Sequence, residues 1–557
     1  MNHIFQQIFF TLVLTFSSLP SSELSRVLYL MQSGNLSLSL QLYREYVNET
    51  GEHDLETIQR IGLMFLDRGR KSNDPEIQLL TLFGAGISLN EEAQYILEDS
   101  IQSGHPQLQL IALNFLARFH NDSAIEILNR AMTSPFLPIR LEAAYQLAIQ
   151  KHPKAVGQIE SLMQKVPSEI HSLFPQLFAI AGDASAIKAL QRLMAHPKEE
   201  VRIEAILSAA KHGRDDLLPD IRRLSTHHTI AQQEACAAAL GLFQDEYSFS
   251  RLQQFAGSPA LSVRLAALEA LFLLGRENIR QEIETIAKDG NLFAIAILGN
   301  IPGSEILLRS LAKSQPLSVR VNAALALLEL GDPSCLPALY DVLLIDSRDL
   351  AFMKIHSFGQ ALEAIKVIPS ARQNLEDNSI AGDLSLHFRE AVLEKTLALP
   401  EKAFLALART LFDKQQADLI PLLSRLLETL QSKDAIALLM ERRDQVGAPL
   451  VRNCCNLALY RLKEPGPYRE ALQRWLSSQQ DVDLIQFRPF IPSDRRDLDI
   501  PHYQLTPQDT SLLLVEAFES LVQTQDQEGI NLLLEAIHHG NEKNRYALAG
   551  LLMRAAH

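Results

Sequence analysis

The chain has 557 residues, of which 47% are hydrophobic and 21% charged, and its formal net charge is −14. This composition excludes general disorder, and the length exceeds what one hydrophobic core supports, so the chain forms either several domains or a repeat array. Nucleic-acid binding depends largely on Lys and Arg neutralising phosphates, and the acidic balance therefore leads us to expect no nucleic-acid partner.

Residues 1–22 have the composition of a signal peptide. An apolar stretch from Ile4 to Phe16 is followed by Ser, Leu and Pro up to Ser22. Its length suits an export signal, although no Lys or Arg precedes it. We expect an exported protein, periplasmic or secreted, with no membrane span in the mature chain, because no later stretch is long and apolar enough. The alternative is a first amphipathic helix of a cytoplasmic protein.

Residues 23–71 are expected to form one or more N-terminal helical hairpins. Two segments in this range, 34–46 and 55–66, place apolar side chains at helical spacing. The pair is weakly similar to a tetratricopeptide hairpin.

A period of 31 residues runs through residues 72–345. Its first position is occupied by Gln78, Gln109, Arg140, His171, Arg202, Gln233 and Arg264. A second position, 19 residues later, always holds Leu or Ile, namely Leu97, Leu128, Ile159, Leu190, Ile221, Leu252 and Ile283. Self-similarity at such a period indicates a solenoid, in which each unit buries its apolar face only against its neighbours.

Each period contains two helices. After Arg140, apolar residues follow at helical spacing, the pattern breaks at His152, and a second apolar stripe begins. Breaks such as Gly182-Asp183 suit this arrangement, because Gly ends a helix in a left-handed conformation and Asp caps the next one. The sequence therefore predicts an all-α fold, an α-solenoid superhelix of antiparallel helical hairpins.

The segments that begin the repeats resemble HEAT repeats. The resemblance is carried by the segments 138–144, 200–206, 262–268 and 318–324, and by Gly331-Asp332-Pro333 with Leu336-Pro337. They are similar to the short HEAT-like repeats of the phycobilisome-lyase type. This resemblance implies a protein-binding scaffold.

Arginine recurs just inside a helix in this register. The residues are Arg140, Arg202, Arg264, Arg320 and Arg452. They could form an anion site, but we favour a structural ladder in which each Arg bonds the turn Asp or the backbone of a neighbouring repeat. Guanidinium groups suit such a role because they donate several hydrogen bonds in a fixed geometry. The resemblance to HEAT families implies the same role.

The period becomes irregular later in the chain. Arg264 and Arg320 are 56 residues apart, so one repeat, near residues 292–311, is predicted to be shortened. Residues 346–476 are predicted to be degenerate helical repeats, and residues 509–557 a C-terminal helical repeat or cap. Thr506-Pro507 is expected to start the helix of this last region, with Thr as its cap.

Between these regions, residues 477–508 form a Pro-rich interval without helical period. Its apolar and basic residues are Ile485, Phe487, Phe490, Ile491, Arg495, Arg496 and Tyr503. Loops of this length are uncommon inside compact arrays. The apolar residues either pack back on the solenoid or form a partner-docking loop whose charged tip is Arg495 and Arg496.

No pattern predicts catalysis, a cofactor or a metal site. Gln233-Glu234 resembles the di-iron helix of HEAT-type deoxyhypusine hydroxylases, but Gln stands where the ligand His belongs, and none of the 16 His residues precedes a Glu. The cysteines, Cys236, Cys335, Cys454 and Cys455, are too few and too scattered for a disulfide framework, and we expect small buried apolar side chains at Cys236 and Cys455.

We therefore expect a non-enzymatic protein-binding scaffold or assembly factor that uses the surface of an α-solenoid. Its protein partners are not identified by the sequence. The alternative is an accessory lyase or chaperone subunit that acts on a cofactor-bearing protein, as the resemblance also implies.

Overall fold

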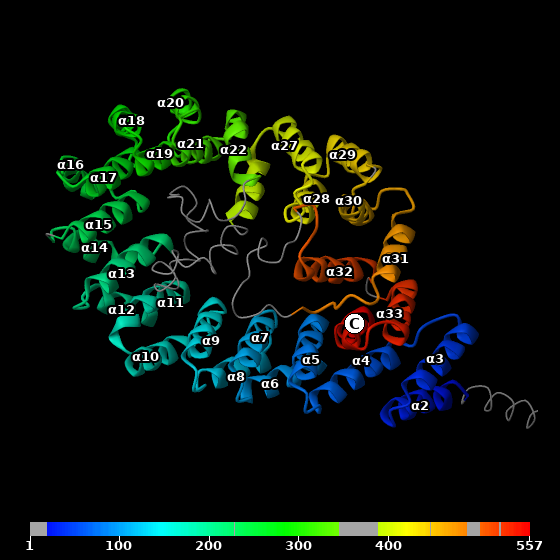
Figure 1. Ribbon diagram of the computed structural model, residues 1–557. Coiled ribbons are helices and arrows are strands. Elements are labelled where there is room, and N and C mark those ends of the chain that lie inside the picture. Colours follow the sequence, from blue (N-terminus) through cyan, green and yellow to red (C-terminus); the bar gives the residue numbers. More distant parts are fainter. Residues whose placement is uncertain (1–18, 228, 345–387, 446, 487–501, 523–524) are drawn as a thin grey trace, which may run out of the picture. The chain divides into compact units, whose positions relative to one another are not determined.

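The computed structural model describes the chain except for residues 1–18, 228, 345–387, 446, 487–501 and 523–524 (Figure 1). Within the described residues, every regular element is an α-helix or a 3-10 helix, which confirms the all-α prediction. The chain forms two compact units. Unit 1 comprises Met1–Ala143, Asn456–Phe487 and Thr506–His557, and unit 2 comprises Ala144–Cys455 and Arg488–Leu505.

Unit 2 is a stack of antiparallel helical hairpins, so the predicted α-solenoid is confirmed. In each hairpin we call the helices, in chain order, the first helix and the second helix. The first helices pack on one another in succession and are α11 (Phe174–Ala181), α13 (Glu199–Lys211), α15 (Ile230–Leu242), α17 (Leu261–Leu273), α19 (Leu292–Leu298) and α21 (Leu317–Glu329). The second helices are α10 (Ala155–Lys165), α12 (Ala184–Met194), α14 (Leu218–Leu224), α16 (Phe249–Ala256), α18 (Arg280–Lys288), α20 (Glu305–Leu311) and α22 (Leu336–Leu343).

The Leu/Ile column of the period lies in the hydrophobic cores of both units. All seven residues, from Leu97 to Ile283, have no exposed surface. Burying each such side chain contributes about 1.5–3 kcal/mol, and every hairpin supplies one. The predicted short repeat is also present, since α19 and α20 have only seven residues each.

The turns inside the hairpins follow from the predicted helix-end signals. Gly182 ends α11 with a φ of +65°, a conformation that costs Gly little, and its amide bonds the carbonyl of Phe178. The Asp183 side chain then accepts hydrogen bonds from the amides of Ser185 and Ala186, both at 2.8 Å, and caps α12. Thr506 caps α32 (Pro507–Leu521) in the same way, as predicted.

The stack continues beyond the undescribed residues 345–387. Arg389, in the helical segment 388–395, donates a 2.5 Å hydrogen bond to the carbonyl of Leu343 and forms an ion pair with Asp418. The hydroxyls of Tyr340 in α22 and Thr410 lie 3.2 Å apart. Residues after 387 therefore pack directly on α21 and α22, and further helices follow, namely α27 (Glu401–Asp413), α28 (Ile420–Leu430), α29 (Lys433–Arg443) and α30 (Pro449–Arg461).

Unit 1 joins residues from both ends of the chain. Its N-terminal helices are α2 (Leu19–Gln32), α3 (Leu36–Thr50), α4 (Leu55–Arg70), α5 (Pro75–Ser88), α6 (Gln94–Gln102), α7 (Pro106–Leu116), α8 (Asp122–Ala131) and the start of α9 (Leu137–Ile149). Its C-terminal helices are the end of α30, α31 (Tyr468–Ser478), α32, α33 (Gln527–His539) and α34 (Arg545–Ala556). Helix α34 packs against both α4 and α5 (Figure 1).

Glycine residues allow α34 to approach the N-terminal helices closely. A Cβ atom at Gly550 would overlap the carbonyl oxygen of Gly84 in α5, and one at Gly62 in α4 would lie 2.9 Å from the carbonyl oxygen of Ala549. Nine of the twelve residues of α34 are buried, as expected for a helix that is apolar on all sides. Helix α34 is thus an interior helix of unit 1.

Among the helices of the described regions, none combines the length and the apolar character that a membrane crossing requires.

Candidate functional site

The first position of the period has one structural role in five repeats. Its side chain reaches back to the backbone carbonyl six residues earlier, in the turn that precedes the helix. The hydrogen bonds run from Gln78 to Ser72 (2.8 Å), Gln109 to Ser103 (2.6 Å), Arg202 to His196 (2.8 Å), Gln233 to His227 (2.8 Å) and Arg320 to Ser314 (3.0 Å). Gln and Arg share this position because both carry an N–H donor on a long side chain.

Two arginines of the predicted ladder also contact a neighbouring helix. Arg202 Nε donates to Gln232 Oε1 in α15 at 2.9 Å, and Arg320 Nε pairs with Asp341 in α22 at 2.6 Å. Within the described residues, the buried Nε atoms of Arg140 and Arg264 lack a hydrogen-bond partner. Arg452 is exposed. The ladder as a property of the whole column therefore stays a prediction.

The turn aspartates are bound by arginines that the sequence analysis did not single out. Arg222 in α14 donates to both carboxylate oxygens of Asp245, at 2.8 and 2.6 Å, and Arg309 in α20 binds Asp332 at 2.6 Å. Both arginines directly follow a buried Ile or Leu and stand 23 residues before their Asp, and this spacing is the signal that could have identified them.

The Asp245 carboxylate is held ionised at this contact. Its side chain is 2% exposed, and burial alone raises the pKa of such a group. The hydrogen bonds from Arg222 and Ser248, together with the Arg222 charge, outweigh burial, so the pKa of Asp245 lies below its ordinary value. The pair locks one hairpin to the next.

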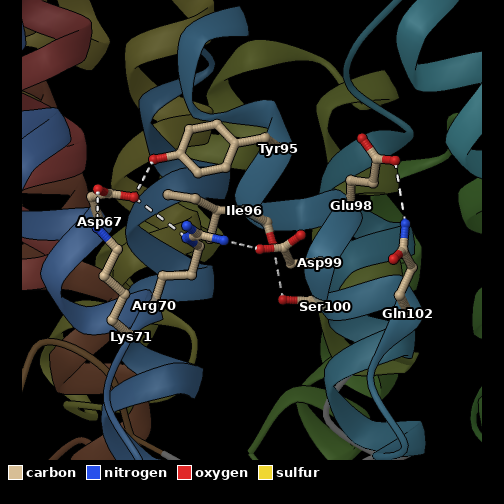
Figure 2. Close-up of polar contacts among 9 residues, drawn as sticks. All are labelled: Asp67, Arg70, Lys71, Tyr95, Ile96, Glu98, Asp99, Ser100 and Gln102. Atoms are coloured by element: carbon tan, nitrogen blue, oxygen red, sulfur yellow. Dashed lines mark hydrogen bonds and ion pairs between the residues drawn. The ribbon is translucent and has the colours of Figure 1, made fainter.

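Figure 2 shows a related network in unit 1, between helices α4 and α6. Asp67 accepts hydrogen bonds from Tyr95 at 2.8 Å and Lys71 at 2.9 Å, while Arg70 bridges Asp67 and Asp99. The Arg70 guanidinium lies 5.2 Å from the Tyr95 ring centroid. Burial raises the pKa of the Asp67 carboxyl, but the bonds from Lys71 and Tyr95 outweigh this and lower it.

Similar ion pairs link helices about one repeat apart elsewhere. Arg130 pairs with Glu98, Arg192 with Glu160 and Arg442 with Asp413. Many charged side chains of both units are therefore used to hold hairpins together. The Figure 2 network belongs to this group, and we interpret it as structural.

The described residues also bear on enzyme chemistry. They contain no group of three or more His, Cys, Asp or Glu side chains that could hold a metal ion. All four cysteines are buried and none forms a disulfide, burial was expected for Cys236 and Cys455, and it raises the pKa of these two thiols to about 12. Thiols of this kind are poor nucleophiles.

The predicted docking loop is only partly described. Phe487, Phe490, Ile491, Arg495 and Arg496 lie outside the described residues, and their role in a docking loop stays a prediction. Ile485 is buried in unit 1, where the amide of its neighbour Leu484 donates to Asn544 at 2.7 Å. Tyr503 is half exposed. Ile485 therefore packs back on the array, which is one of the two alternatives that the sequence left open.

A different surface exposes large apolar side chains. In unit 2, first helices end and second helices begin along one edge of the stack, and consecutive hairpins place an apolar residue there. We call the four residues the apolar edge; their exposed fractions are 57% for Leu242, 89% for Tyr247, 36% for Leu273 and 82% for Ile306. Single exposed apolar residues are ordinary, but residues that recur on adjacent repeats point to a binding surface.

Neighbouring groups hold Tyr247 in its exposed position. The Arg222 guanidinium, fixed by Asp245, lies 5.0 Å from the Tyr247 ring centroid. The next turn repeats this chemistry, since Arg276 lies 4.7 Å from the ring centroid of Phe249 and 3.7 Å from Glu246. A cation on one face of the ring orders Tyr247 while its other face stays open to solvent.

The fold defines a class of protein, the all-α helical-repeat proteins built from stacked hairpins. More specifically, residues 319–344, which include most of α21 and all of α22, match the family model of the PBS lyase HEAT-like repeat. Among curated proteins, no sequence relative matches the chain.

Solved structures with similar helical repeats include the complex of CpcE and CpcF of phycocyanin lyase from Nostoc sp. PCC7120, with 19% identity over 44% of this chain and 94% of that chain, and a TM-score of 0.30. UNC-45 from Drosophila melanogaster is 13% identical over 96% of this chain and 88% of that chain, with a TM-score of 0.32. A crystal structure of importin beta is 12% identical over 90% and 76% of the two chains, with a TM-score of 0.29. Similarity at this level carries no information about function.

Proposed function

We propose that this protein is a non-enzymatic scaffold that binds a protein partner along the apolar edge of unit 2. The observation that carries the proposal is that three successive hairpins expose an apolar side chain near the turn between their two helices, Leu242, Leu273 and Ile306, beside the oriented ring of Tyr247. Solenoids bind partners through such repeated, modest contacts.

The spacing of the apolar edge suits a polypeptide partner. Packed helices lie about 8–10 Å apart, so neighbouring hairpins present one apolar side chain at about that interval. A partner segment with apolar side chains at a matching interval would bury several of them at once. Tyr247 is the expected centre of the contact, because aromatic residues that are already ordered cost little entropy on binding and often dominate interfaces.

Site-specific photocrosslinking in the native host tests this proposal. A photoreactive amino acid at Tyr247 or Ile306 is expected to crosslink one and the same partner, whereas Gln253, exposed on the second helix α16, serves as the control position. With that partner purified, Tyr247→Asp and Ile306→Asp are each expected to weaken binding at least about tenfold, because a charge would be buried in an apolar contact. Gln253→Asp should leave the affinity unchanged, and equal affinities for all three variants would refute the proposal.

The alternative function is an accessory lyase or chaperone subunit that acts on a cofactor-bearing protein. The match to the PBS lyase HEAT-like repeat supports it only at the level of one repeat, residues 319–344. Absorption spectra of the protein purified from its host distinguish the two functions. A coloured or stoichiometric bound small molecule would favour the alternative, and a colourless protein that copurifies with a partner would favour the scaffold.

We also propose that the protein is exported to the periplasm or secreted. The support is the apolar stretch and serine-rich boundary within residues 1–22, of which 1–18 lie outside the described residues. Sequencing the N-terminus of the protein from cell fractions tests this. A cytosolic protein that still begins at Met1 would reject export.

A further inference from the structure

A buried histidine connects the two ends of the chain within unit 1. His53 precedes α4, is 7% exposed, and contacts Gln527, the first residue of α33. The His53 backbone amide donates to Gln527 Oε1 at 2.6 Å, and its ring Nε2 lies 3.2 Å from the Gln527 carbonyl oxygen. These residues are separated by 474 positions in the sequence.

The hydrogen bonds fix the neutral form of the ring. Because the Gln527 carbonyl can only accept, Nε2 carries the hydrogen. Nδ1 then accepts from the Tyr43 hydroxyl at 3.2 Å, and that hydroxyl accepts from the Asp54 amide at 3.1 Å. Tyr43 is fully buried, and its ring stacks on the imidazole with centroids 5.8 Å apart. A proton on Nδ1 would require the hydroxyl to turn towards the Asp54 carbonyl, 3.4 Å away.

The charged groups on the surrounding elements have other partners. The Asp54 carboxylate caps α4 by accepting from the Thr57 amide at 2.8 Å. On α33, Glu535 pairs with Arg44 of α3, and Glu528 pairs with Arg469, which also binds Asp526. The other groups that face this contact are Tyr43 and Tyr46 of α3, Asn531 of α33 and the exposed Glu52. A charge on the ring would therefore be compensated poorly.

From this geometry we propose that His53 is a pH-sensitive latch, and that its protonation at mildly acidic pH releases the connection between α3 and α4 from α33. The proposal is independent of the proposed function. In the closed state, burial lowers the pKa of His53 below its ordinary value of 6.5, and the bonds to Gln527 and Asn531 offset this only in part.

The direction of the pH effect follows from proton linkage. Between the lowered pKa of the closed state and 6.5, the open state binds more protons than the closed state. The free energy that favours the closed state is therefore largest above pH 6.5 and decreases as the pH falls towards the lowered pKa of His53. Below that pKa it is constant. The contacts of α34 with α4 and α5 do not involve His53, so we expect the change to be local.

Hydrogen–deuterium exchange of the full chain at pH 7.5 and pH 5.5, corrected for intrinsic rates, tests the latch. In the wild type, exchange in residues 43–58 and 527–539 is expected to increase severalfold at pH 5.5. His53→Gln should remove this pH dependence, while His120→Gln, at an exposed site of unit 1, should retain it. Equal pH dependence in the wild type and His53→Gln would overturn the proposal.

A second variant keeps the test valid if His53→Gln does not fold. Tyr43→Phe keeps the titrating ring but removes the hydroxyl that donates to its neutral form, so the pH at which exchange increases should move upwards. Wild-type exchange that does not change with pH, or a Tyr43→Phe transition at the same pH as the wild type, would show that the contact is purely structural.

Discussion

At the scale of single residues, the period is maintained by one kind of hydrogen-bond donor. Gln78, Gln109 and Gln233 make the same bond to a carbonyl six residues earlier as Arg202 and Arg320 do. In the sequence, the charge of the arginines is the most visible property of this column. The structure indicates that the shared property is an N–H group on a long side chain, which charge alone does not identify.

The bond between Arg222 and Asp245 leads to a pH-dependent prediction. Asp245→Asn removes the negative charge from a buried, charge-assisted contact and is expected to destabilise the fold by about 2 kcal/mol at pH 7. Because the pKa of Asp245 is lowered in the folded state, this stabilisation is complete above pH 3.8 and is lost as the pH falls through the folded-state pKa.

Urea unfolding of the wild type and Asp245→Asn at several pH values measures this effect. The difference between the two midpoints should shrink below pH 3.8. Asp216→Asn, at an exposed carboxylate of the preceding hairpin's turn, is the control and should change stability little. If the difference between the two midpoints stayed constant below pH 3.8, Asp245 would not have the stabilising role assigned to its ionised form.

At the scale of helices, the close packing of α34 on α5 depends on glycine residues, which have no side chain. Gly550→Ala would place a Cβ against the backbone of Gly84, and because two packed helices must then separate, we expect a loss of about 1–3 kcal/mol. Gly157→Ala, in helix α10, is the matched control. Apart from its chain neighbours and the backbone of its own helix, its Cβ would have no heavy atom within 4 Å, so it should stabilise the protein by about 0.5–1 kcal/mol.

Thermal unfolding of both variants checks this pair of predictions. Opposite shifts of Tm are expected from the same chemical change at two helical glycines. If Gly550→Ala were as stable as the wild type, α34 would not pack in this way against α5.

The helices also show what the sequence could and could not predict. The buried Leu/Ile column, the cap at Asp183 and the short α19 and α20 follow from local patterns, because each depends on residues within one hairpin. The contacts of α34 with α4 and α5 depend on residues far apart in the chain, and no local pattern specifies them. The apolar edge was missed for a related reason, since Leu242 and Leu273 end helices rich in apolar residues and resemble core positions.

At the scale of the whole molecule, each unit is held together differently. Unit 2 repeats one set of contacts from hairpin to hairpin, and its stability is expected to be close to a sum of similar terms. Unit 1 adds contacts between the N-terminal and C-terminal helices, including His53 with Gln527 and Lys543 with Glu76. Truncation at either end of the chain should therefore disturb residues at the other end.

The central claim is that the 31-residue period of unit 2 corresponds to a physical stack of hairpins that presents equivalent positions side by side. Spin labels at Ile149, Lys211 and Leu273, the last residues of α9, α13 and α17 and each two repeats from the next, test it by pulsed electron–electron double resonance. The account predicts that the two shorter distances are equal, at about 20 Å each, and that the third is close to their sum. Unequal short distances, or a distance between residues 149 and 273 no longer than either of them, would contradict it.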